Sequence, residues 1–143
     1  MGVKISTMIL FENLGLRPEL LKAITTRGYK TATPIQAQSI PKILAGHDIL
    51  AGAQTGTGKT AAFALPLLQI LSNKQNQGHR PRALILTPTR ELAAQVLEFI
   101  KDYGQDLTLR STAIFGGVNI RPQKTKQDRK SGSAGMPRPI SYA

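Results

Sequence analysis

The sequence predicts an α/β domain in which a parallel sheet carries helices on both faces. Short apolar runs, typical of buried strands, alternate along the chain with longer amphipathic stretches. A glycine-rich loop joins one of the apolar runs directly to a helical stretch. This alternation favours a parallel sheet, because the helices that connect parallel strands cover both of its faces.

Three apolar runs are the expected strands. Residues 48–51 stand between Gly46 and the glycine-rich loop, and residues 83–86 stop shortly before Pro88. Residues 107–115 alternate more loosely, with Leu107, Leu109, Ala113 and Phe115 sharing one face.

Four helices are expected around these strands. Pro18 and Pro34 suit the first turn of a helix, and Thr33 is a good N-cap for the second of them. Gly104 follows the last amphipathic stretch and is expected to end it. The expected helices are residues 18–27, 34–45, 59–71 and 91–103.

The composition divides the chain into three regions. Its 143 residues suffice for one domain, which we place at residues 11–122 after an N-terminal extension of residues 1–10. Residues 123–143 are rich in Lys, Arg, Ser, Gly and Pro and have almost no apolar periodicity. Such a segment buries too little surface to offset its ordering entropy, so we expect a disordered basic tail.

The charge predicts an anionic partner. The formal net charge is +11, and about half of it lies in residues 121–143, so basic residues occur along the whole chain. This distribution suits a polyanion such as nucleic acid, although a basic surface can also serve solubility alone. The chain has no cysteine, which excludes disulfides and thiolate metal sites. Without a signal peptide or a membrane span, a soluble cytoplasmic protein that binds no membrane is expected.

Residues 53–60 form the strongest motif and predict a phosphate-binding loop. They fit G-x-x-x-x-G-K-[ST] except for Ala at the first position, and they stand between an expected strand and an expected helix. Backbone N–H groups of such a loop surround a phosphate, the lysine bridges the terminal phosphates and the threonine hydroxyl ligates Mg²⁺. The nucleotide-binding residues are therefore Ala53, Gln54, Thr55, Gly56, Thr57, Gly58, Lys59 and Thr60, with Lys59 and Thr60 as the catalytic pair.

Two other residues have a purely structural interpretation when taken alone. Gln36 stands three positions after Thr33 and can simply close a capping box. Phe11, taken alone, is a core residue.

These motifs occur together in an order that resembles the amino-terminal half of the first RecA-like domain of DEAD-box RNA helicases. Phe11 and residues 28–36 resemble the Q motif with its upstream aromatic residue, and residues 53–60 resemble motif I, in which alanine is usual at the first position. Residues 88–93 resemble motif Ia, and Gly116-Gly117 the double-glycine motif. The resemblance spans about residues 11–123 and implies a partial RecA-like fold.

The resemblance also implies roles for individual residues. Gln36 is implied to read the adenine of ATP, with Phe11 packing on the ring, and both the capping and the adenine role of Gln36 can hold. The implied contacts to the RNA backbone come from Pro88, Thr89, Arg90, Gly116 and Gly117. ATP and Mg²⁺ are the implied cofactors, and RNA is the implied partner.

Other parts of the family pattern do not occur in these 143 residues. They contain no Asp-Glu-Ala-Asp box, no Ser-Ala-Thr motif and no second RecA-like domain, so we expect neither useful ATP hydrolysis nor RNA unwinding. In the family, the strand before motif I is flanked by strands that come later in the chain. A frameshift between about residues 121 and 133 is one hypothesis for the tail, and the gene sequence tests it.

Two alternatives to a helicase fragment stay open at this point. The first is a non-catalytic module that binds nucleotide or RNA. The second is a P-loop ATPase that acts on DNA or protein, against which the Gln36 motif argues.

Overall fold

The computed structural model describes residues 8–73 and 80–116. Gly117 and the tail at residues 123–143 lie outside the described residues, as does most of the N-terminal extension. The elements, in chain order, are β1 (Ile9–Leu10), the 3₁₀ turn η1 (Phe11–Leu14), α1 (Pro18–Thr26), β2 (Thr31–Ala32), α2 (Pro34–Leu44), α3 (Lys59–Asn73) and α4 (Arg90–Tyr103).

The four expected helices are confirmed, with boundaries that differ by one or two residues. Pro18 and Pro34 occupy the first turns of α1 and α2. The hydroxyl of Thr89 caps α4 by accepting a hydrogen bond from the Leu92 N–H at 3.2 Å. These helix ends are set locally, by residues within one turn of them.

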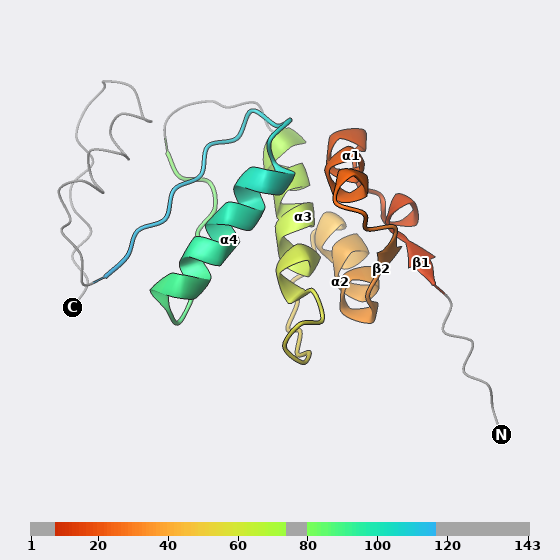
Figure 1. Cartoon of the computed structure of the whole chain (residues 1–143), viewed down its shortest axis with the longest axis horizontal. Coiled ribbons are helices and arrows are strands. Elements are labelled where there is room, and N and C mark those ends of the chain that lie inside the picture. Colours follow the sequence, from red (N-terminus) through yellow and green to blue (C-terminus); the bar gives the residue numbers. More distant parts are fainter. Residues whose placement is uncertain (1–7, 74–79, 117–143) are drawn as a thin grey trace.

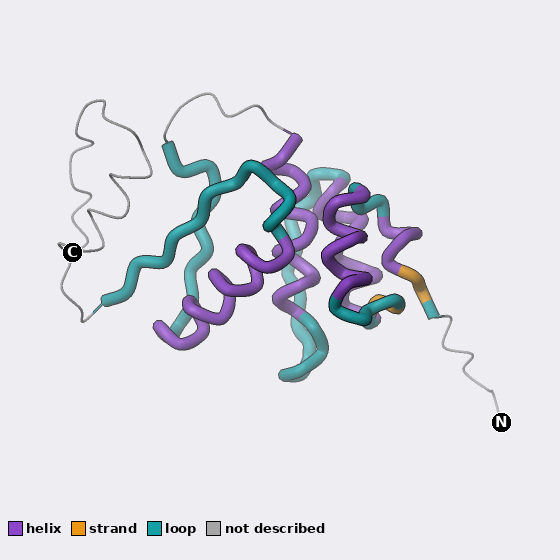
Figure 2. Tube along the Cα trace, turned by 45° about the horizontal axis from the view of Figure 1, so that its top comes forward, coloured by secondary structure: helices purple, strands orange, loops and turns teal. Residues whose placement is uncertain are grey.

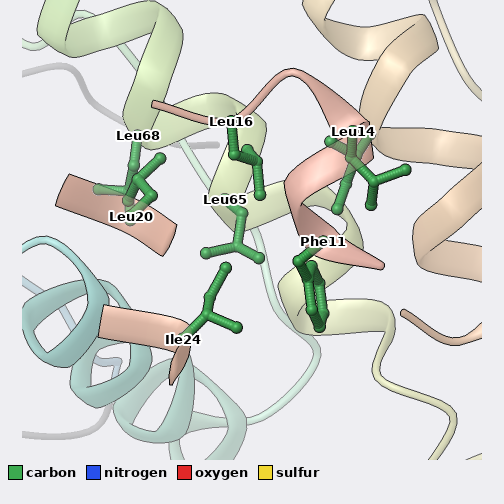
Figure 3. Close-up of a cluster of buried hydrophobic side chains, with 8 residues drawn as sticks. Phe11, Leu14, Leu16, Leu20, Ile24, Leu65 and Leu68 are labelled. Carbon is green, nitrogen blue, oxygen red and sulfur yellow. The ribbon is translucent and has the colours of Figure 1, made fainter. Parts of the chain in front are cut away.

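Helix α3 lies at the centre of the molecule, with α4 on one side and α1 and α2 on the other (Figure 1). Its most extensive contact is with α2. Figure 3 shows how apolar side chains from η1, α1 and α3 converge beside it. The buried cluster consists of Phe11, Leu14, Leu16, Leu20, Ile24, Ile40, Leu65 and Leu68.

Helices α1 and α4 are joined by a group centred on Arg27. Its guanidinium carbon lies 4.5 Å from the centre of the Tyr103 ring, and it forms an ion pair of 3.3 Å with Asp102. The Tyr103 ring stacks on Phe99 at 4.1 Å, and burial raises the pKa of its hydroxyl. The basic residue thus fastens the end of α1 to the last turn of α4.

The prediction of strands at residues 48–51, 83–86 and 107–115 is wrong for the described residues. The described residues form one sheet, in which β1 and β2 pair in antiparallel orientation. Ile9 lies opposite Ala32, and Leu10 lies opposite Thr31. Figure 2 draws the three expected strands as loops. The physical reason is that a strand forms only when its backbone hydrogen-bonds to an adjacent strand. The apolar character of one segment does not supply that adjacent strand.

The side-chain alternation expected for residues 107–115 is nevertheless present. Leu107, Leu109, Ala113 and Phe115 are partly buried, whereas each residue that follows them is exposed. Leu107 and Leu109 pack against the buried cluster. Leu50, Leu84 and Leu86, from the other two segments, are largely exposed. Residues 107–115 therefore alternate as a strand does, and apolar side chains of the other two segments remain uncovered in the described part of the chain.

A pair of leucine substitutions tests this division between core and surface. Leu20→Ala should lower the free energy of unfolding by about 2–5 kcal/mol, because the side chain is fully buried and its removal leaves a cavity. Leu84→Ala, at a position that is 76% exposed, should change it by less than about 0.5 kcal/mol. Urea unfolding followed by circular dichroism measures both. Equal effects of the two substitutions would contradict the arrangement of helices described above.

Candidate functional site

The phosphate-binding loop of residues 53–60 has the conformation that its glycines permit. Gly56 and Gly58 have positive φ angles of 81° and 80°, where a side chain would be strained. The hydroxyl of Thr57 donates to the Gln54 carbonyl at 2.6 Å and tightens the turn between them. Helix α3 begins at Lys59, so the N-terminal N–H groups of the helix adjoin the loop.

Lys59 closes the loop in this structure. Its ammonium group donates to the backbone carbonyl of Ala53, at the other end of the loop. The side chain is exposed, so an anion that enters the loop can take the place of that carbonyl. Thr60, the second residue of α3, lies beside it and is partly buried.

The start of α2, with its N-cap Thr33, is bonded directly to the loop. The Thr33 hydroxyl donates to the Thr57 carbonyl at 2.8 Å, and the Gln36 amide nitrogen donates to the Gly58 carbonyl at 3.2 Å. Gln36 also accepts the backbone N–H of Thr33 at 2.9 Å, which confirms the capping interpretation. Sequence reasoning assigned Thr33 only a capping role and missed its bond to the loop, because the two residues are 24 positions apart.

Phe11 lies among the core residues, as its apolar character alone suggests. It is 5% exposed, belongs to the buried cluster (Figure 3) and donates its backbone N–H to the Lys30 carbonyl at 3.2 Å. This hydrogen bond holds η1 against the segment that precedes Gln36. A contact between Phe11 and adenine stays a prediction.

A second candidate site lies at the N-terminus of α4. A surface cavity of about 410 Å³ brings together residues that are more than twenty positions apart in the sequence. Four of the five residues expected to bind RNA line it, and the fifth, Gly117, falls outside the described residues. Ala93, the last residue of the segment that resembles motif Ia, also lines it, as do Thr87, Ile114 and Phe115, to which no motif had pointed. The lining residues are Thr87, Pro88, Thr89, Arg90, Ala93, Ile114, Phe115 and Gly116.

The chemistry of this cavity suits an anion or a sugar–phosphate chain. The N-terminus of α4 carries partial positive charge, and Arg90 adds a full one. The Arg90 guanidinium contacts Glu91 at 3.1 Å, but both side chains are well exposed, so this pair is weak and can exchange for a phosphate. The phosphate-binding loop is a separate site, because none of its residues lines the cavity.

Neither site brings together a metal-binding cluster in the described part of the chain. No group of three or more His, Cys, Asp or Glu side chains gathers there. None of the helices in residues 8–73 and 80–116 is long and apolar enough to cross a membrane.

Residues 33–136 match the DEAD/DEAH box helicase family model. The match continues into residues 123–136, which their composition assigns to the tail.

The chain is similar to ATP-dependent RNA helicases. It is 48% identical over 113 residues to the ATP-dependent RNA helicase CshA of Limosilactobacillus reuteri, covering 79% of this chain and 22% of the relative. It is 45% identical over the same length to the ATP-dependent RNA helicase dbp10 of Schizosaccharomyces pombe, of which it covers 13%. The chain thus spans less than a quarter of these relatives.

Two solved structures have a similar fold. A DEAD box protein from the hyperthermophile Methanococcus jannaschii matches with a TM-score of 0.74 and 41% identity, over 82% of this chain and 31% of that protein. The RNA helicase Prp28 from Chaetomium thermophilum bound to ADP matches with a TM-score of 0.77 and 37% identity, over 92% of this chain and 32% of that protein. These likenesses confirm the partial RecA-like α/β fold class, although the strands of its sheet do not form in the described residues.

A series of glycine substitutions tests the contact between the loop and Gln36. Gly58→Ala should lower the free energy of unfolding by about 2 kcal/mol or more, because the new methyl group meets the Gln36 amide in a backbone conformation that already strains alanine. Gly56→Ala has the strain without the collision and should cost about 1 kcal/mol. Gly52→Ala has neither and should cost less than about 0.5 kcal/mol. Chemical denaturation checks this order, which a cost for Gly58→Ala no larger than that for Gly56→Ala would contradict.

Proposed function

Since this chain belongs to the DEAD/DEAH box helicase family, we propose that it binds ATP at residues 53–60 and RNA at the cavity beside α4. The observation that carries the proposal is the docking of Thr33 and Gln36 onto the phosphate-binding loop. It places a side-chain amide that can recognise a base next to backbone groups that can hold a triphosphate. RNA as the partner implies an intracellular protein.

Lys59 and Thr60 hold the triphosphate end of the nucleotide. The Lys59 ammonium leaves the Ala53 carbonyl and bridges the β- and γ-phosphates. Mg²⁺ fits this site, because it binds through one or two protein oxygens together with phosphate oxygens, and the Thr60 hydroxyl supplies such an oxygen. The metal would neutralise phosphate charge.

Gln36 reads the base. Its amide uses one donor and one acceptor within the protein, which leaves one of each for an adenine edge. Phe11, in η1, is 5% exposed, and we infer that it packs on the ring of the base.

RNA binds through its backbone at the second site. Pro88, Thr89, Arg90 and Gly116 line one cavity at the positive end of α4, and Gly117 continues the same segment. Such contacts hold a strand without reading its sequence. The net charge of +11 adds long-range attraction for a polyanion.

A chain of these 143 residues should bind ATP without turning it over. Hydrolysis by longer relatives needs carboxylates that position the metal and the attacking water, and no Asp-Glu-Ala-Asp sequence occurs here. The longer relatives are ATP-dependent RNA helicases, and this chain corresponds to their ATP-binding and RNA-binding part. Turnover in the presence of RNA at the rate of a full-length helicase would refute the binding-only role.

Substitutions in the loop and in α2 separate the two ends of the nucleotide. Lys59→Ala should raise the Kd for ATP at least about tenfold, because charge-assisted bonds to phosphate are lost. Gln36→Ala should weaken ATP about tenfold more than GTP, because the adenine contact is lost for ATP alone, whereas the loss of the bonds to Thr33 and Gly58 affects both nucleotides alike. Lys101→Ala, an exposed position at the other end of α4, is the control that matches the charge change. Calorimetric titration with Mg²⁺ present checks these values, and an equal loss of both nucleotides in Gln36→Ala would contradict base reading.

Arg90→Ala tests the RNA site. It should weaken binding of a single-stranded RNA uniformly across sequences and reduce the slope of log K against log salt by about 0.7, since one phosphate contact is removed. Lys101→Ala should leave that slope nearly unchanged. Fluorescence anisotropy at several salt concentrations provides the measurement. A slope that drops equally in both variants would show that RNA binding depends on overall charge and not on this cavity.

A further inference from the structure

The turn that carries Phe11 is attached to α3 by the side chain of Gln69. The Gln69 amide oxygen accepts the backbone N–H of Arg17 at 2.7 Å, and its nitrogen donates to the Gly15 carbonyl at 2.8 Å. Both bonds join residues that are more than fifty positions apart. One side chain thus satisfies two backbone groups of the loop between η1 and α1.

The side chain of Arg17 reinforces this attachment. Its guanidinium donates to both carboxylate oxygens of Glu19, at 2.9 and 3.0 Å, and to the hydroxyl of Ser72 at 2.7 Å. The hydrogen bond from Arg17 lowers the pKa of the Glu19 carboxyl. Ser72 in turn donates to the Gln69 carbonyl at 2.8 Å. The loop is therefore tied to the C-terminal half of α3 through both its backbone and its side chains.

This attachment lies at the opposite end of α3 from the phosphate-binding loop. Lys59 and Gln69 are ten residues apart, a distance of about 15 Å along the helix axis. We call residues 9–36 the N-terminal layer. Its residues are joined to one another by the β1–β2 pairing and by the bond from Phe11 to the Lys30 carbonyl. The N-terminal layer is thus held at one end of α3 by Thr33 and Gln36 and at the other by Gln69.

We propose that Gln69 is a positioning residue that determines the affinity for the base of the nucleotide, while leaving the affinity for the phosphates unchanged. The inference rests on the function proposed above. A base must meet the N-terminal layer and the phosphate-binding loop together, so its binding depends on their relative placement. The triphosphate meets the loop alone. If the bonds of Gln69 are lost, the apolar cluster and the side chains of Arg17 and Arg27 still hold the layer, but the loop between η1 and α1 loses the two backbone contacts that set its position along α3.

The test compares two ligands in the 143-residue chain with Mg²⁺ present. Gln69→Leu should raise the Kd for ATP about tenfold, since two hydrogen bonds that fix the layer are lost. The Kd for inorganic tripolyphosphate should stay within about twofold of the original value. Hydrogen–deuterium exchange should become faster in residues 11–17 and stay unchanged in the first turns of α3.

Two further variants act as controls. Gln69→Glu keeps the acceptor for the Arg17 N–H but loses the donor to the Gly15 carbonyl, so its Kd for ATP should be intermediate. Gln95→Leu removes an exposed amide from α4 and should change neither Kd. If Gln69→Leu does not fold, Gln69→Glu provides the same comparison.

Each outcome decides the question. An equal loss of ATP and tripolyphosphate binding would mean that Gln69 only stabilises the fold. An unchanged Kd for ATP in both Gln69 variants would overturn the inference while the proposed function stands. If the unsubstituted chain binds tripolyphosphate no more weakly than ATP, base recognition itself is wrong, and the inference is overturned with it.

Discussion

The bonds from Thr33 and Gln36 to the carbonyls of Thr57 and Gly58 connect the two halves of the proposed nucleotide site. Both carbonyls belong to a loop that turns sharply and cannot satisfy all its own polar groups. The bonds hold that loop against the start of α2, and α2 packs along α3, which begins in the loop. The same contact explains why residue 58 is glycine, because a methyl group there would displace the amide. Loop conformation, helix packing and the proposed base recognition therefore depend on one small set of hydrogen bonds.

Helix α3 connects the phosphate-binding loop to the other parts of the molecule. Its N-terminus contributes to the phosphate-binding loop, Leu65 and Leu68 join the buried cluster, and Gln69 holds the loop after η1. Neighbouring segments are therefore positioned relative to α3 and not to a sheet. This is a consequence of the unformed strands, since in the described residues the helices have only one another to pack against. The exposed leucines at positions 50, 84 and 86 mark the face where a sheet with its covering helices would complete the layer structure.

Local signals in the sequence were sufficient for the helices and for the turn of the glycine-rich loop, but not for the strands. Pro18, Thr89 and Gly104 act within one turn of a helix end, so each can be interpreted without knowing the rest of the fold. The glycine-rich loop is likewise local. Pairing of residues 83–86 depends on which segment lies beside them, and apolar composition cannot supply that information. The bonds of Gln69 to Gly15 and Arg17 were missed for the same reason: a glutamine in an apolar helix gives no sign of a partner more than fifty residues away.

Gln36 shows how a structural and a functional role can share one side chain. An amide offers two donors and two acceptor lone pairs. Closing the capping box uses one acceptor, and the bond to Gly58 uses one donor, so half of its capacity remains. Because those two bonds fix the orientation of a side chain that is 7% exposed, the remaining donor and acceptor point in fixed directions before a ligand arrives. A base that matches them loses little ordering entropy on binding. In the proposed function, the capping role would therefore make the amide selective, since a free glutamine could turn to suit another base.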